Sequence, residues 1–314
     1  MMMSARYDAP TGIRQVRTDH APVFLLAPIR SFSTVCLALL AGHPELYGFP
    51  EMLLFSTPDV RGLLNEQARR PEVPRPWIRS RLTGVLRAVA ELHEQSQRPD
   101  AIARAESWLA QRADWPTVRL MDHLLDLAQP RTGLEKSPDS THSDQTLDAC
   151  ISAYPNARFI HLTRHPVTTQ RSMHRHLRYL WADDPQGMFV RSASVWYLTH
   201  LRIAKRLAAL PPEKSQRVRA EDLLGEPDVW LRRICEWLGL ARDADVIARM
   251  RHTESWRFAG TGASGSLGGG DPKFMHSPKL RPITEPGPVE FPPGWGLHPE
   301  LTRRMTRLAM FLGY

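Results

Sequence analysis

The stretch VFLLAPIRSFSTVCLALL, residues 23–40, carries the strongest structural signal in the chain. An apolar strand from Val23 to Ala27 runs into a short polar loop, and an apolar helix follows the loop. A loop between a strand and a helix directs several backbone N–H groups and the positive end of the helix dipole toward one point. The stretch therefore predicts an anion site, most often a site for phosphate, in an α/β protein.

The side chains of this loop suit an anion. Arg30 can form charge-assisted hydrogen bonds, and the hydroxyls of Ser31, Ser33 and Thr34 can donate to phosphate oxygens. Both glycines and the lysine of the nucleoside-triphosphate loop GxxxxGK[ST] are missing, so this loop is of another type. A buried helix capped by serine after a core strand is the alternative structural interpretation.

A second signature, FIHLTRHPVTTQRS, occupies residues 159–172. Arg164 follows a predicted strand, Phe159 to Thr163, at the carboxyl end where ligands bind in open α/β sheets. Pro166 starts a helix, which puts Ser172 about two turns along on a face that can point back to the strand end. Arg164 and Ser172 are thus candidates to hold a second phosphate. A surface arginine and a helix-packing serine are the alternative.

The rest of the chain alternates short apolar runs with helical patterns, and a third strand is predicted from Arg217 to Ala220. This alternation predicts a central, mostly parallel sheet flanked by helices. We expect an N-terminal tail at residues 1–20 and a single domain at 21–314, with a helical insertion at about 60–130. The Gly/Pro-rich segment at about 258–300, which includes GTGASGSLGGG at 260–270, is expected to act as a lid or to bind the acceptor.

Composition narrows the class of protein further. The net charge of +8 fits an anionic small molecule, a carrier protein, nucleic acid or an anionic membrane surface. Three cysteines, Cys36, Cys150 and Cys235, stand far apart in apolar helical patterns, which argues against a disulfide framework and a zinc site. No cleavable leader or long apolar run is visible, so we expect a cytoplasmic protein without a transmembrane segment.

The two phosphate signatures, in this order, resemble those of the sulfotransferases that use 3′-phosphoadenosine 5′-phosphosulfate (PAPS). The first loop of that family typically reads Arg or Lys, Ser, Gly, Ser or Thr, Thr. Residues 30–34 are similar, with Phe32 at the position of the usual glycine. The resemblance implies that Arg30, Ser31, Phe32, Ser33 and Thr34 bind the 5′-phosphosulfate. It also implies that Arg164 and Ser172 bind the 3′-phosphate.

Three further segments extend the resemblance over roughly Pro22 to Leu240 and beyond. LEKSP, centred on Lys136, looks like a lysine segment of the family, and VRAEDLLGEPDVWLRRICEWLGL from Val218 looks like its later strand and helix. GGDPKF, with Lys273, is similar to the late loop that covers the nucleotide. The implied architecture is the sulfotransferase fold, which is related to the P-loop nucleotide kinases, with a helical insertion.

The implied reaction is in-line transfer of a sulfuryl group to a hydroxyl, less often to an amine. Negative charge grows on the departing phosphate, so Arg30 and Lys136 are the expected catalytic cations. Glu51, in HPELYGFPEMLLF, occupies a position where one group of the family has its general base. His43, His123 and His142 are rival bases, since histidine titrates near neutral pH. No metal is expected.

The acceptor class stays open between a small hydroxylated metabolite, a lipid, a sugar and a carrier-tethered intermediate. Two other functions compete with sulfuryl transfer. One is an ATP- and magnesium-dependent phosphotransferase, against which the missing GK[ST] lysine argues. The other is a non-catalytic polyanion-binding protein, but no basic stripe interleaved with aromatics is visible, and nucleic acid is not expected as a partner.

Overall fold

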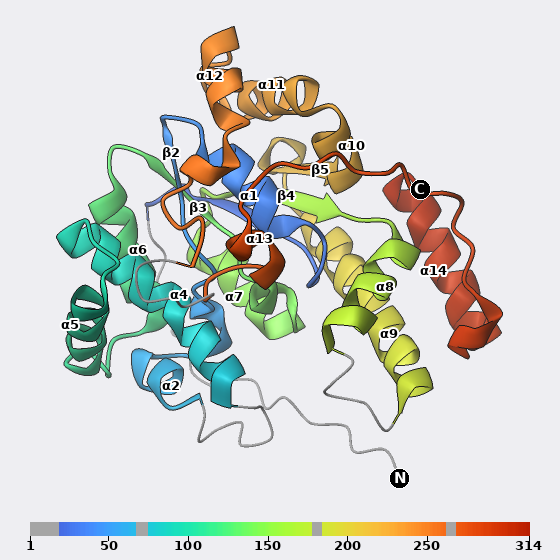
Figure 1. The fold of residues 1–314 in the computed structure, drawn as a ribbon, viewed down its shortest axis with the longest axis horizontal. Coiled ribbons are helices and arrows are strands. Elements are labelled where there is room, and N and C mark those ends of the chain that lie inside the picture. The colour runs from blue at the N-terminus through green and yellow to red at the C-terminus, as the bar shows by residue number, and fades with distance from the viewer. Residues whose placement is uncertain (1–18, 67–74, 178–183, 262–267) are drawn as a thin grey trace.

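The computed structural model of the chain describes residues 19–66, 75–177, 184–261 and 268–314. Within these residues the centre is a five-stranded sheet with the order β2-β3-β1-β4-β5, in which every neighbouring pair is parallel. The strands are β1 (Val23–Leu26), β2 (Leu46–Gly48), β3 (Thr132–Glu135), β4 (Arg158–Thr163) and β5 (Ser215–Arg219). The predicted α/β class with a mostly parallel central sheet is confirmed (Figure 1).

The central strand β1 is buried along its whole length between β3 and β4. Phe24 pairs in register with Phe159 of β4, and the two rings stack with their centroids 5.7 Å apart. A strand that is covered on both faces has no solvent side, which explains why its sequence is an uninterrupted apolar run. Four predicted boundaries need correction. β1 ends one residue before Ala27 and β4 starts one residue before Phe159. β5 starts two residues before Arg217, and Ala220 begins a helix rather than ending β5.

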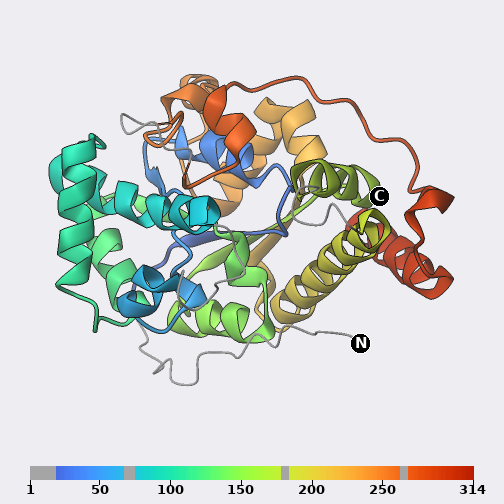
Figure 2. The same ribbon diagram turned by 60° about the horizontal axis from the view of Figure 1, so that its bottom comes forward.

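Helices cover both faces of the sheet (Figure 2). One face carries α1 (Ser33–Ala41) with α10 (Ala220–Gly225) and α12 (Ala244–Met250) beside it and α11 (Pro227–Leu238) packed on α10 and α12. The other face carries α7 (Asp144–Ala153) and α9 (Pro185–Leu207). Short 3-10 turns connect several elements: η1 (Leu54–Ser56), η2 (Pro138–Thr141), η3 (Pro212–Lys214) and η4 (Thr253–Ser255).

Between β2 and β3 the chain forms helices α2 (Val60–Leu64), α4 (Arg75–Glu94), α5 (Pro99–Ala110) and α6 (Thr117–Ala128), which lie to the left in Figure 1. Helix α6 buries Val118, Met121 and Leu125 on one face, in the spacing of an amphipathic helix. This face packs on the sheet, because Gly133 of β3 leaves room for the Leu125 side chain.

Arg87 of α4 connects the insertion to the C-terminal part of the chain. Its side chain is fully buried and donates to the carbonyls of Gly268 and Phe258, at 3.0 Å each, while its Nε donates to Gln97. Phe258 precedes the Gly-rich segment 260–270 that the sequence singled out, and Gly268 lies within it. One buried guanidinium therefore connects the chain just before that segment to a residue near the segment's end.

After this segment come α13 (Pro272–His276), an extended Pro-rich stretch, η5 (Pro293–Trp295) and α14 (Pro299–Leu312). The stretch is attached to α8 (Pro166–Leu177) and α9 by a stack of three rings, His174, Phe189 and Trp295, whose neighbouring centroids lie 4.4 and 4.5 Å apart. Helix α14 packs against Trp196 of α9 through a second apolar cluster.

The three cysteines are buried and form no disulfide. In the part of the chain that the structure describes, no helix combines the length and the apolar character that crossing a lipid bilayer requires.

Candidate active site

The two sequence signatures lie at the same edge of the sheet. Arg30 follows β1, Lys136 follows β3 and Arg164 follows β4, all at carboxyl ends of parallel strands. Glu51 follows the edge strand β2 and reaches the same place. This edge is where open α/β sheets bind ligands, since the loops there converge beside the helix N-termini.

The first loop has an unusual backbone. Arg30 and Phe32 both have positive φ values, 65° and 60°, although neither is glycine. Phe32 occupies the N-cap of α1, and no side chain caps the helix there, so the serine-capped helix considered from the sequence is wrong. The Ser31 hydroxyl is fully buried and finds no hydrogen-bond partner among the described residues. The loop therefore presents a hydroxyl and uncapped backbone donors that suit an anion.

Lys136 and Glu51 meet beside this loop. Lys136 donates to the Thr34 hydroxyl at 3.0 Å and forms an ion pair with Glu51. The lysine side chain is only 3% exposed, whereas that of Glu51 is 25% exposed. A buried cation thus stands next to the helix start, and its carboxylate partner remains open to a reactant.

Hydrogen bonds to Ser137 support the loop that carries Glu51. Its hydroxyl accepts hydrogen bonds from the backbone N–H groups of Met52 and Leu53, at 3.0 Å each, and donates to the Glu135 carboxylate. Leu53 has a φ of 60°, a conformation that needs such support. Burial raises the pKa of Glu135 to about 7, although the Ser137 hydrogen bond counteracts part of the effect. These contacts fix the position of Glu51.

Arg164 and Ser172 both contact Arg30, so the two signatures form one site. Arg164 donates from Nη1 to the Arg30 carbonyl at 2.6 Å, and its guanidinium carbon lies 3.7 Å from the centre of the Phe32 ring. The Ser172 hydroxyl accepts a 3.1 Å hydrogen bond from Arg30 Nε. Burial lowers the pKa of Arg164 to about 10, which leaves it charged at neutral pH, and its Nε has no partner among the described residues.

Asp271 is a site residue that the sequence analysis missed. Its carboxylate pairs with Arg30, its backbone N–H donates to the Thr34 hydroxyl at 3.0 Å, and it caps α13. An Asp before a Pro is a helix-start signal, so the cap could have been predicted, but its contact with a loop 241 positions earlier could not. The Asp271 carboxylate thus pairs with the Arg30 guanidinium, which the sequence analysis assigned to an anionic ligand.

The remaining predicted residues lie in different surroundings. Ser33 is buried in the first turn of α1, whereas the Lys273 side chain is exposed on α13 and only its backbone N–H contacts Asp271. Among the rival bases, His43 is buried, with Nε2 against the Ala241 carbonyl and Nδ1 accepting from the Glu45 N–H.

His123 lies in an aromatic cluster of the insertion, 3.0 Å from His93, and burial lowers its pKa. His142 is exposed at the end of η2. Among the residues described, no three His, Cys, Asp or Glu side chains are grouped as metal ligands.

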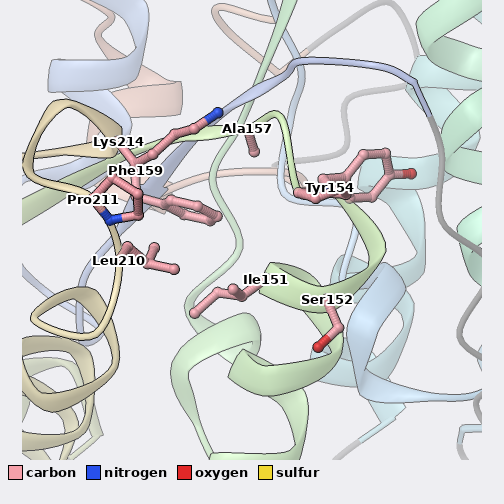
Figure 3. A pocket seen from close by; sticks show the side chains of 9 residues that line it. Ile151, Ser152, Tyr154, Ala157, Phe159, Leu210, Pro211 and Lys214 are labelled. Carbon is pink, nitrogen blue, oxygen red and sulfur yellow. The ribbon is translucent and has the colours of Figure 1, made fainter.

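A separate cavity of about 310 Å³ lies at the opposite edge of the sheet (Figure 3). Phe159, near the start of β4, and Lys214, just before β5, line it together with Leu210 and Ile151. The cavity therefore faces away from the residues at the carboxyl ends of the strands.

A parallel sheet whose central strand leads into a loop with uncapped backbone donors, with cations at three strand ends, defines an α/β protein with a candidate anion site. The chain belongs to the sulfotransferase family, whose model matches residues 22–244. The resemblance to the sulfotransferases that the two signatures indicated is thus confirmed at the level of the family.

The relatives agree with this assignment. The omega-hydroxy-beta-dihydromenaquinone-9 sulfotransferase Stf3 of Mycobacterium bovis is 27% identical over 127 residues, which are 38% of this chain. The match spans 32% of that relative's length, about a third. The sulfotransferase domain from the curacin biosynthetic pathway has 21% identity and a TM-score of 0.73, covering 95% of this chain and 99% of its own.

The sulfotransferase domain from the olefin synthase of Synechococcus PCC 7002 has 23% identity and a TM-score of 0.71. That match covers 96% of this chain and 98% of the domain. At these identities the two structures show a common fold.

Proposed function

We propose that the protein transfers a sulfuryl group from PAPS to a hydroxyl of its acceptor. The observation that carries this proposal is the junction between Arg30 and Arg164, which joins the two predicted phosphate sites through a 2.6 Å hydrogen bond. A donor with phosphate groups at both the 3′ and the 5′ position of its ribose matches a site with two arginines from two strand ends.

The donors left over in this site fit such a ligand. The Ser31 hydroxyl and Arg164 Nε are buried and without partners within the described ranges, which is costly unless a bound group satisfies them. Arg30 already binds one anion, the carboxylate of Asp271, at the position where we propose that it binds the donor. The site is therefore built to bind negatively charged oxygens.

We assign the residues of the first loop, Arg30 to Thr34, to the 5′-phosphosulfate, with hydroxyl donors from Ser31, Ser33 and Thr34. Arg164 and Ser172 are assigned to the 3′-phosphate. Lys273, exposed at the start of α13, lies on the segment that contacts the loop and is assigned to the outer side of the nucleotide.

When bound, PAPS supplies the sulfuryl group and a phosphate as leaving group. Glu51 takes the proton of the acceptor hydroxyl, which is a task for a carboxylate that is open to solvent. Lys136 and Arg30 hold positive charge beside Thr34, where they stabilise the negative charge that grows on the leaving oxygen. The protein is proposed to work in a reducing cytoplasm, in keeping with its three buried free thiols.

We propose a hydroxyl acceptor, because Stf3 is named for the transfer of sulfate to an omega-hydroxy compound. The acceptor is a small molecule or a carrier-bound intermediate, and the same hydroxyl on a lipid or a sugar would meet the same residues.

Calorimetric titration with 3′-phosphoadenosine 5′-phosphate (PAP), run beside ADP and beside ATP with magnesium, tests the donor. We expect one-to-one binding of PAP that ADP does not match. Preference for ATP with magnesium would instead favour a phosphotransferase. Binding that is weak, unsaturable and lost with salt would favour a polyanion-binding protein.

A further inference from the structure

We propose that Phe32 is a positioning residue for recognition of the donor's 3′-phosphate, because its ring is the platform on which the Arg164 guanidinium lies. The inference deepens the proposed function and depends on it. It gives a role to the one residue of the first loop that departs from the family pattern.

The backbone at Phe32 is in a conformation that favours glycine. Its φ and ψ are 60° and 13°, in the left-handed region, where a side chain is disfavoured by contact with its own backbone. Phe32 also makes no side-chain hydrogen bond as the N-cap of α1. Local conformation therefore disfavours phenylalanine here, and the contacts of its ring must compensate.

The main polar contact of the ring is Arg164. The guanidinium carbon lies 3.7 Å from the ring centre, well inside the range of a cation–π interaction. Phe32 is itself half-buried and packed against the hydrophobic core, and this packing holds its ring in place. Because Arg164 is largely withdrawn from water, the attraction between its charge and the ring is stronger than at an exposed site.

The Phe32 ring and the Arg30 carbonyl together hold Arg164 from two sides. The ring covers one face of the guanidinium, and the carbonyl accepts from Nη1 at 2.6 Å. The Nε edge has no partner among the described residues. A guanidinium that is held in this way keeps its free donors in one direction, which lowers the cost of ordering it when a phosphate binds.

The test compares PAP with adenosine 5′-phosphate, which lacks the 3′-phosphate, in calorimetric titrations of the wild-type protein and three variants. The dissociation constant for adenosine 5′-phosphate divided by that for PAP is the ratio that measures recognition of the 3′-phosphate. Phe32→Gly relieves the backbone and removes the ring, Phe32→Leu keeps an apolar side chain without a π face, and Phe32→Tyr keeps the π face. We expect Phe32→Gly and Phe32→Leu to reduce the ratio roughly 3- to 30-fold and Phe32→Tyr to retain it.

The ratio separates positioning from general damage to the loop. If Phe32→Gly and Phe32→Leu weaken the binding of both nucleotides equally, or leave both affinities unchanged, the inference is overturned. Thermal unfolding of each variant shows whether it is folded. Failure of the proposed function looks different: the wild-type protein itself would not distinguish PAP from adenosine 5′-phosphate.

Discussion

Lys136 and Glu51 form an ion pair although they follow different strands and stand 85 positions apart in the chain. They meet because β2 and β3 are parallel neighbours, which brings both carboxyl ends to one edge. Lys136 also donates a hydrogen bond to the Thr34 hydroxyl, so the ion pair lies at the start of α1. A cation and a carboxylate thus stand together beside the first loop, residues 30–34.

Glu51→Gln tests the proposed base. The amide has the shape of the carboxylate but does not accept the proton, so we expect turnover to fall about 10²- to 10⁴-fold, while the affinity for PAP changes little. Steady-state kinetics and calorimetry measure the two effects. Glu45→Gln, an exposed carboxylate near the same strand, is the control. Wild-type turnover in Glu51→Gln would move the search for the base to His142.

Arg164→Ala tests the second phosphate site. Loss of the charged hydrogen bonds should weaken PAP binding by about 1.5–3 kcal/mol and leave the fold intact. Calorimetry gives the affinity and circular dichroism checks the fold. Arg61→Ala, at an exposed position on α2, should leave binding unchanged. An unchanged affinity for PAP in Arg164→Ala would remove this residue from the site.

Asp271→Asn tests whether the aspartate competes with the donor for Arg30. Asparagine can still cap α13, but the negative charge that faces the Arg30 guanidinium is lost. We expect PAP to bind about tenfold more tightly, because it no longer displaces a charged partner. Asp243→Asn, at the cap of the distant α12, is a matched control. If PAP binding weakens instead, Asp271 orients Arg30 for the donor.

Ser137→Ala tests the support under Glu51. It leaves two backbone N–H groups and the Glu135 carboxyl without their partner, so the free energy of unfolding should fall by about 2–4 kcal/mol. Turnover should fall as well, because the Glu51 loop loses its fixed position. Urea unfolding and kinetics measure these effects. Ser194→Ala, whose hydroxyl bonds its own helix, is the control, and equal stability of the two variants would contradict the role.

Stability should decline with acid because of a buried histidine pair. His161 Nε2 lies 2.9 Å from His200 Nδ1, and burial lowers the pKa of both, that of His200 to about 3. A depressed pKa contributes stability that is present above the unfolded value of about 6.5 and is lost as the pH falls toward the folded value.

The loss for one such histidine approaches about 1.4 kcal/mol per pH unit below pH 6.5. His200→Gln should therefore give a shallower decline of the unfolding free energy between pH 7 and pH 5 than the wild-type protein. His252→Gln, at an exposed position, should keep the wild-type slope. Parallel pH profiles for wild type and His200→Gln would contradict this assignment.

The sequence was sufficient for the buried central strands β1 and β4. The strands around Phe24 and Ile160 were predicted to within one residue, because buried central strands read as apolar runs. The edge strand around Val218 was predicted to within two residues, although Val218 is its one buried residue. Strands β2 and β3 were not predicted, since Leu46–Gly48 and Thr132–Glu135 contain glycine and neither is an apolar run of four residues. These segments form strands because β2 pairs with β3 and β3 pairs with β1 in the sheet.

In the candidate site, local signals predicted the residues on strand-to-helix loops, Arg30 to Thr34 and Arg164. Lys136 and Glu51 came from the family resemblance, and their ion pair depends on the order of the strands. Asp271 depends on a contact across the chain that no local pattern encodes.

Because Arg87 binds the carbonyls of Phe258 and Gly268, the position of Asp271 in the site does not depend on the sequence between those two residues. Because the guanidinium binds both carbonyls, the residues between them can be exchanged or lengthened without changing where the chain re-enters at Asp271. In general, doubling the length of a surface connection adds only about 0.6 kcal/mol to the cost of closing it. This stretch is therefore a natural place to insert a peptide tag or a fluorescent reporter that follows events at the site.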